Sequence, residues 1–447
     1  MRKNFIMLAL ALAGVIACLS SCSRTEELLA TVPASSQIVV AVNFEELANA
    51  SGFAIHDSTV TIPENIRLSP PAKSQIMKII PALRTGADIS DVVVASINNN
   101  RTVFATFLLK DQEVLRRAMR DVGAVAQGNK EGYDCYAVGN DLFIYLGDGQ
   151  GWAVFGSSNT TPKDIIEETK EGTFKKEYPA LAEYLSGNKM ISIVATGRGM
   201  NVAANQWMCV DVQPKDNDLV IGTRRMDSEG NVLANSSLQN LDPTVLKLLP
   251  ANAPIVIAAG LTKDIDWNSI AMIGGMVGGF QVGGMLESVV PYLSKTDGTI
   301  EFAVVPMSEN AWSNPSLSDW NFVFAAQMSQ SDAEAAVNAA RNYLSTMFTV
   351  SSQTGDFVAG QGDFSFKVSS ANGVFSVVKG NVQQGADMEA YAGDRMLVKA
   401  MIPALFVLRN DNISVTSVTG ETETTTTIAI PGSKFPLLQT VLGDIFR

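Results

Sequence analysis

The chain is poor in the residues that most hydrolytic and metal-dependent active sites use. It contains one histidine, His56, among 447 residues. This count argues against histidine-based triads and excludes zinc sites built from two or three histidines. We expect His56 to lie in a loop or on the surface. Aromatic residues make up only 7%, which argues weakly against an aromatic-lined site for carbohydrate hydrolysis.

Positive charge is also scarce. The sequence has 33 Lys and Arg against 45 Asp and Glu, for a formal net charge of −12. A nucleic-acid-binding protein needs a basic surface, so we expect no nucleic-acid partner. Hydrophobic residues make up 46%, which excludes a disordered chain, and the length suits two or three domains. The sequence indicates no metal site, no cofactor and no identifiable small-molecule ligand.

The N-terminal segment has the pattern of a bacterial lipoprotein signal. Arg2 and Lys3 precede an apolar run over 5–19, which is shorter than the about 20 residues of a membrane span. The run ends in Leu-Ser-Ser-Cys22, which resembles a lipobox, and Cys18 lies in a looser match. We predict a signal peptide over 1–21, lipidation with diacylglycerol and a further acyl chain at Cys22, and a lipidated tether over 22–30. The alternative is a soluble secreted protein in which Cys22 has no role.

Ser23 follows the predicted anchor. An aspartate at this position often marks inner-membrane retention in enteric bacteria, so by analogy we expect the outer membrane. Whether the protein faces the periplasm or the cell surface stays open. An acidic chain gains nothing from anionic lipid, so the acyl chains alone would hold it.

Four short segments recur in the same order in the second half of the chain, which indicates an internal duplication. The clearest pair is Val32–Ala41 and Leu249–Ala258. The other pairs are 79–83 with 289–293, 103–105 with 323–325, and 187–191 with 393–397. We predict two homologous repeats, over 31–240 and 241–447.

Each repeat is predicted to belong to the α+β class, as an antiparallel sheet with helices packed on one face. Asp111 is expected to cap a helix over 112–122, and Ser331 with Glu334 fits a capping box before a helix over 335–347. A further helix is expected over 175–186. Strands are expected over 38–42, 91–97, 102–109, 133–138, 142–146, 152–156 and 219–226, and in the second repeat over 255–259, 299–305, 320–328, 364–368 and 374–378.

The combination of a lipobox, the segment V-P-x-x-x-x-I-V-V over 32–40 and a diverged second copy resembles a Bacteroidota lipoprotein family of uncharacterised function. The resemblance implies a cell-envelope address and a duplicated α+β body. The family supplies no established catalytic residues, so none is assigned here.

Several motifs suggest chemistry, but each has a simpler structural interpretation. Ser186 and Lys189 have the S-x-x-K spacing of a serine nucleophile, whereas the partner motifs are missing and Gly187 suits a left-handed helix C-cap. Gly147–Gly151 precedes a strand rather than a helix, so we expect a hairpin turn and not a phosphate loop. Asp216–Asp218 and Asn410–Asn412 are expected to form turns rather than calcium sites.

The remaining candidates are cysteines and carboxylates. Cys135 and Cys209 could form a disulfide in the envelope, but we favour two buried free thiols. Arg224 and Arg225 are adjacent in a strand and should point to opposite faces. The carboxylates Asp88 with Asp91 and Asp264 with Asp266 lie close in sequence, and only their spatial separation could support acid–base catalysis.

The most unusual segment is apolar and glycine-rich, over 273–286. It is either a mobile flap that binds lipid or a closely packed helix or loop. We predict that the protein is not an enzyme but a lipid-anchored binding or interaction module, held at the membrane and contacting another envelope protein. The alternative is a carrier of a lipid or other apolar ligand through 273–286, and a carboxylate-dependent hydrolase is less favoured.

Overall fold

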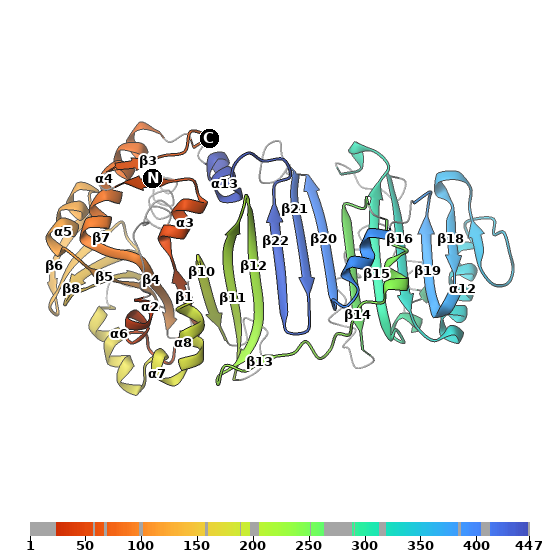
Figure 1. Cartoon of the computed structure of the whole chain (residues 1–447), viewed down its shortest axis with the longest axis horizontal. Coiled ribbons are helices and arrows are strands. Elements are labelled where there is room, and N and C mark those ends of the chain that lie inside the picture. The colour runs from red at the N-terminus through yellow and green to blue at the C-terminus, as the bar shows by residue number, and fades with distance from the viewer. Residues whose placement is uncertain are drawn as a thin grey trace. The chain divides into compact units, whose positions relative to one another are not determined.

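The structure, a computed structural model, divides the chain into two compact units (Figure 1). The first unit runs to Leu233 and includes 432–447, and the second unit is Ala234–Pro431. Each unit is described by itself. The described residues are 24–445 except 57–58, 67–68, 98–101, 157–159, 188, 197–204, 251, 263–287, 290, 313–318, 383–385 and 404–411.

The first unit is built on one antiparallel sheet with the strand order β6-β7-β8-β9-β5-β4-β1-β10-β11-β12-β13. β1 lies inside the sheet, where Val39 is paired with Ala95 of β4 on one side and with Val194 of β10 on the other. The strands are β1 (Ile38–Val42), β4 (Ala87–Ile97), β5 (Thr102–Leu109), β6 (Val125–Lys130), β7 (Tyr133–Val138), β8 (Leu142–Gly147), β9 (Gln150–Phe155), β10 (Ile191–Ala195), β11 (Gln206–Lys215), β12 (Asp218–Asp227) and β13 (Val232–Leu233). A separate hairpin pairs β2 (Ala54–His56) with β3 (Thr59–Thr61).

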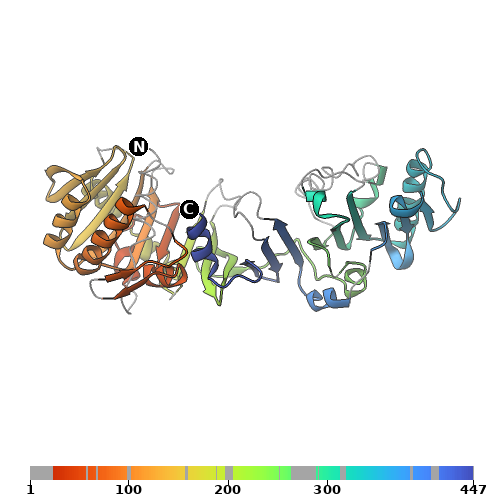
Figure 2. The same cartoon turned by 90° about the horizontal axis from the view of Figure 1, so that it is seen from above.

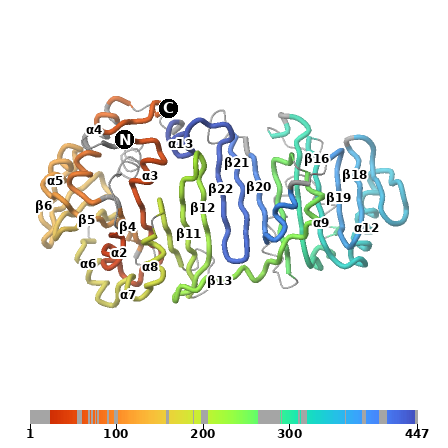
Figure 3. Tube along the Cα trace, in the orientation of Figure 1, coloured from red at the N-terminus to blue at the C-terminus, as the bar shows by residue number. Residues whose placement is uncertain are grey.

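Helices cover both faces of this sheet, so the prediction that they pack on one face is wrong. One core contains Val39, Ala95 and Phe104 with residues of α2 (Thr25–Leu29), α6 (Pro162–Glu168), α7 (Phe174–Glu177) and α8 (Pro179–Leu185). The opposite face packs against α3 (Phe44–Ala50), α4 (Pro70–Gly86), α5 (Gln112–Asp121) and α13 (Leu437–Ile445). The chain returns to this unit through α13, drawn in dark blue against β12 (Figures 2 and 3), where the Leu437 N–H donates to the Asn217 carbonyl at 2.8 Å.

Local capping explains where the helices of this unit begin. The Asp111 carboxylate accepts hydrogen bonds from the backbone N–H groups of Glu113 and Val114, which confirms the predicted cap of α5. The single helix expected over 175–186 is wrong, because Pro179 has no N–H to continue helix α7 and instead starts α8.

The second unit has the strand order β17-β18-β19-β16-β15-β14-β20-β21-β22, again antiparallel. The strands are β14 (Ile255–Leu261), β15 (Gly298–Pro306), β16 (Trp320–Gln327), β17 (Phe357–Ala359), β18 (Phe366–Ser369), β19 (Val374–Lys379), β20 (Met396–Pro403), β21 (Asn412–Thr419) and β22 (Glu423–Ala429).

Both faces of this second sheet also carry helical elements. Its larger core joins Phe302 and Phe324 to α12 (Gln330–Leu344), and its smaller core joins Val256 and Ala303 to α9 (Pro243–Leu246) and the 3₁₀ helix over Ala386–Tyr391. Helix α12 begins earlier than the predicted capping box. Ser329, not Ser331, is its N-cap, and the Ser329 side chain accepts from the Asp332 N–H.

The two compact units do not end at the bounds predicted for the repeats. The second unit begins at Ala234 rather than at residue 241, and 432–447 belong to the first unit. The expected tether over 22–30 also differs, because Thr25–Leu29 form helix α2 with Leu28 and Leu29 fully buried. Cys22 and the segment 1–21 predicted to be a signal peptide lie outside the described residues.

Candidate functional site

The S-x-x-K motif does not form a nucleophile–base pair. The Ser186 hydroxyl donates to the Ala182 carbonyl at 2.8 Å, while Lys189 Nζ lies 3.4 Å from an oxygen of Asp211. Ser186 itself caps α8 with right-handed helical angles, and Gly187 is not among the residues with positive φ. The expected left-handed cap at Gly187 is therefore wrong, although the structural interpretation of the motif stands.

Lys189 instead belongs to a polar cluster around Asp211, whose side chain is 10% exposed. The Tyr184 hydroxyl donates to Asp211 at 3.2 Å, and the Gln213 amide donates at 3.3 Å. Arg224 lies 4.0 Å from the Asp211 carboxylate, and its guanidinium carbon is 5.0 Å from the centre of the Tyr184 ring. Desolvation and the Asp211 charge raise the pKa of Tyr184, so its phenol is neutral. The hydrogen bond from this phenol to Asp211 connects α8 to the sheet.

Cys135 and Cys209 are both free and buried, as expected. Burial raises the pKa of the Cys209 thiol to about 12, although nearby Arg224 acts in the opposite direction. Burial also raises the pKa of Cys135. Because the thiolate is the reactive form, these side chains act as small core residues rather than as redox or nucleophilic groups.

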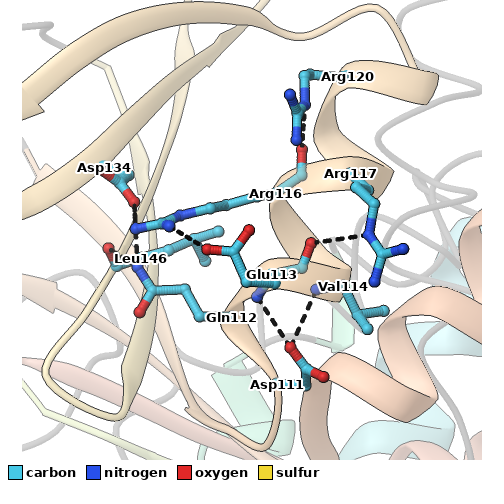
Figure 4. A network of polar contacts seen from close by, with 9 residues as sticks. All are labelled: Asp111, Gln112, Glu113, Val114, Arg116, Arg117, Arg120, Asp134 and Leu146. Atoms are coloured by element: carbon cyan, nitrogen blue, oxygen red, sulfur yellow. Dashed lines mark hydrogen bonds and ion pairs between the residues drawn. The ribbon is translucent and has the colours of Figure 1, made fainter.

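A second polar network connects α5 to the β7–β8 hairpin (Figure 4). Arg116 pairs with both Glu113 and Asp134, and Gln112 donates to Asp134 and to the Leu146 carbonyl, each at 3.1 Å. Arg117 and Arg120 donate to backbone carbonyls of their own helix. The contacts of Arg116 and Gln112 hold the hairpin to the helix.

The glycine-rich turn is a hairpin turn, as predicted. Asp148 and Gly149, with φ of 52° and 73°, form the two-residue connection between β8 and β9. Asp216 has φ of 55° in the turn between β11 and β12. Among the described residues, no group of three or more His, Cys, Asp or Glu side chains is placed to hold a metal ion.

Several predictions fall wholly or partly outside the described residues, and Asn410 and Asp411 of the turn predicted at Asn410–Asn412 are among them. His56 lies in strand β2 rather than in a loop, but its side chain is outside the described part. Asp264 with Asp266, and the glycine-rich segment 273–286, fall in the gap 263–287. No helix within the described ranges has the length and apolar character required to cross a bilayer.

The carboxylates of Asp88 and Asp91 hold the N-terminal segment and do not form a catalytic pair. Asp91 accepts from the Arg24 N–H and from the Thr25 hydroxyl, both at 2.9 Å. Asp88 pairs with the Arg24 guanidinium at 3.4 Å and with Lys110 at 3.5 Å. We call these two aspartates with Arg24 and Thr25 the N-terminal clasp.

Glu301 was not identified from the sequence. It lies in β15 between Ala258 of β14 and Ala325 of β16, and it is 1% exposed. Neither of its carboxylate oxygens has a hydrogen-bond partner among the described residues. Desolvation raises the pKa of Glu301 well above its usual value, so the side chain is a buried neutral acid. The signal in the sequence was a lone charge within an otherwise uncharged, mostly apolar strand.

In each sheet, one face of the later strands carries apolar side chains that stay partly exposed. In the first unit one rung joins Ile191, Val212 and Ile221, and the next joins Ile193 and Val210. We call these five residues the first open face. The second open face consists of the partly exposed residues Val398, Ala400, Ile413, Val415 and Ile428 on β20, β21 and β22. Exposed apolar surfaces of this kind are typical of contacts with other molecules.

The second unit also has a cavity of about 300 Å³. It lies at the ends of β14 and β15 and is lined mainly by proline, tryptophan and methionine. Trp312 packs edge-on against Trp320, with ring centres 4.8 Å apart. The lining residues are Asn252, Pro254, Val305, Pro306, Trp312, Met401 and Asn412.

Comparisons with known proteins identify no family. No family profile and no curated protein matches the chain. Three crystal forms of TP0453 are weakly similar in structure. Form III has a TM-score of 0.33 at 11% identity over 51% of this chain and 87% of that chain. Forms I and IV both have TM-scores of 0.30, at 12% and 11% identity, over 44% and 45% of this chain and 78% and 83% of those chains.

The buried acid makes the stability of the second unit depend on pH. Because the pKa of Glu301 is raised in the folded state, the unfolded state loses its proton first as the pH rises above about 4.5. We expect wild type to lose stability relative to Glu301→Gln above this pH, by up to about 1.4 kcal/mol per pH unit, until the pH reaches the folded-state pKa. Urea unfolding followed by circular dichroism between pH 4 and 8 measures the difference. The same substitution at exposed Glu423 is the control, and parallel profiles for wild type and Glu301→Gln would contradict the assignment.

Proposed function

We propose that this chain is an outer-membrane lipoprotein, anchored through acyl chains on Cys22, that binds another envelope protein without catalysing a reaction. We further propose that it belongs to an uncharacterised Bacteroidota lipoprotein family and that its body consists of two homologous repeats. The observation that carries the binding function is the pair of open faces.

The order of strands supports a duplication. In each unit a central strand (β1 or β14) is followed in the chain by its neighbour on one side (β4 or β15), and a strand later in the chain (β10 or β20) completes the other side. A helix follows the next strand in both, α5 after β5 and α12 after β16. Two unrelated sheets would not be expected to share this order along so many strands.

The buried ladder across each sheet supports the same proposal. In both units the middle rung joins three side chains that are at most 1% exposed. The rungs are Val39–Ala95–Phe104 in the first unit and Val256–Ala303–Val323 in the second.

The polar side chains of the described residues support a binding role rather than catalysis. Asp211, Asp134, Asp88 and Asp91 are each engaged with cations or hydrogen-bond donors that connect elements of the fold. The buried thiols are protonated, and Glu301 is closed to solvent. The two open faces, by contrast, are apolar and stay partly accessible, which suits recognition of a protein.

Metabolic labelling with radioactive palmitate tests the anchor. We expect label in wild type and its loss in Cys22→Ala, because the acylated cysteine would be gone. Cys18→Ala is the matched control, since it removes a cysteine from the apolar run and leaves the proposed lipobox unchanged. Label that persists in Cys22→Ala would contradict the anchor.

Photo-cross-linking in cells tests the binding role. Benzoylphenylalanine at Val210 or Ile221, on the first open face, should give a discrete adduct with one envelope protein. The same residue at Asn140, in an exposed turn of the first unit, should not, because the proposed contact is made by the open face. The absence of adducts at the open face, or equal adducts at all three positions, would contradict the proposal.

A further inference from the structure

The folded body begins directly after the proposed anchor. Arg24 is two positions after Cys22, and Thr25 already starts helix α2. Leu28, Leu29 and Val32 are at most 1% exposed and belong to the main core of the first unit. This packing fixes residues 25–32 to the sheet, so they cannot act as a flexible linker between the folded body and the proposed anchor.

The N-terminal clasp fixes Arg24 and Thr25, which are closer in sequence to the proposed anchor than Leu28, Leu29 and Val32. Both aspartates come from β4, a strand inside the sheet. Asp91 holds the backbone of Arg24 and the side chain of Thr25, and Asp88 holds the guanidinium of Arg24. Because one carboxylate accepts hydrogen bonds from a backbone N–H and from a hydroxyl, it fixes both the position and the orientation of this segment.

We propose that the N-terminal clasp seats the first unit directly on the lipid headgroup layer, with no flexible tether between the acyl chains and the folded body. The proposal rests on lipidation of Cys22. Two peptide links span at most about 8 Å between Cα atoms, so the clasp must lie at the level of the headgroups. The part of the first unit around the clasp is then a membrane-contact surface.

The charges around the clasp indicate which headgroups fit. Arg24 and Lys110 have side chains that are 55% and 40% exposed, and Lys175 pairs with Glu26 at 2.9 Å with both side chains partly exposed. Cations therefore alternate with carboxylates over this surface. Such a mixture matches zwitterionic headgroups, which present phosphate and amine together, and it gives no preference for anionic lipid.

Headgroup quenching on vesicles tests the seating. The acylated full-length chain is placed in phosphatidylcholine–phosphatidylethanolamine vesicles that contain a nitroxide on a fraction of headgroups. Bimane is attached to Glu27→Cys on α2 or to Asn140→Cys, both exposed positions. Asn140 and Lys110 lie at opposite ends of the sheet, which are about 20 Å apart along strand β8. We expect several-fold stronger quenching at position 27 than at 140.

Two changes relax the seating by different amounts. A flexible insertion of about twelve Gly and Ser residues before Arg24 adds a reach of about 20 Å and should reduce quenching at position 27 to the level at 140. Replacing Asp88 and Asp91 by Ala should give an intermediate value, because α2 stays packed. Asp121→Ala with Asp141→Ala removes the same charge from exposed positions and should match wild type.

The outcomes separate the seating from the anchor. Equal quenching at 27 and 140, or no effect of the insertion, would overturn the seating although the protein is acylated and bound to vesicles. Wild-type quenching in the Asp88→Ala, Asp91→Ala variant, with circular dichroism unchanged, would overturn the role of the clasp. A chain without acyl label that does not bind vesicles would show instead that the proposed anchor had failed.

Discussion

The structure depends on one constraint, the antiparallel pairing of a central strand on both of its edges. β1 and β14 each satisfy their backbone groups with two neighbours, which fixes the register of the whole sheet and decides which side chains face each core. Val39 and Val256 are fully buried for this reason. The helices then cover both faces of the central strands, whereas apolar side chains on one face of β10–β12 and of β20–β22 stay partly exposed.

This arrangement assigns different tasks to polar and apolar groups. The charged clusters at Asp211 and at the N-terminal clasp connect helices and the leading segment to the sheet, so their chemistry is used within the fold. The open faces keep apolar side chains partly exposed at a cost that a folded protein avoids unless another molecule covers them. We therefore interpret the chain as a scaffold that presents sheet surfaces from a body seated close to the bilayer.

Much of the secondary structure follows from local pattern, whereas the register and the site do not. The strand over 102–109 and the cap at Asp111 agree with the sequence prediction, because alternation and capping are local signals. The recurring sequence segments align Phe104 with Phe324, whereas the strand pairing places Phe104 at the position of Val323. A shift of one residue exchanges the two faces of a strand, so the sequence alignment assigns these side chains to the wrong face. Glu301 and the clasp depend on contacts between distant segments, which no local pattern contains.

In our proposal, the folded body starts immediately after the lipid anchor at Cys22. Hydrogen–deuterium exchange of the lipid-free chain, read at the backbone amides of Leu28 and Leu29, tests where the folded body begins. We expect protection of these amides comparable to that of β4, because helix α2 is part of the main core of the first unit. Exchange of these amides at the rate of an unstructured peptide, with β4 protected, would contradict it.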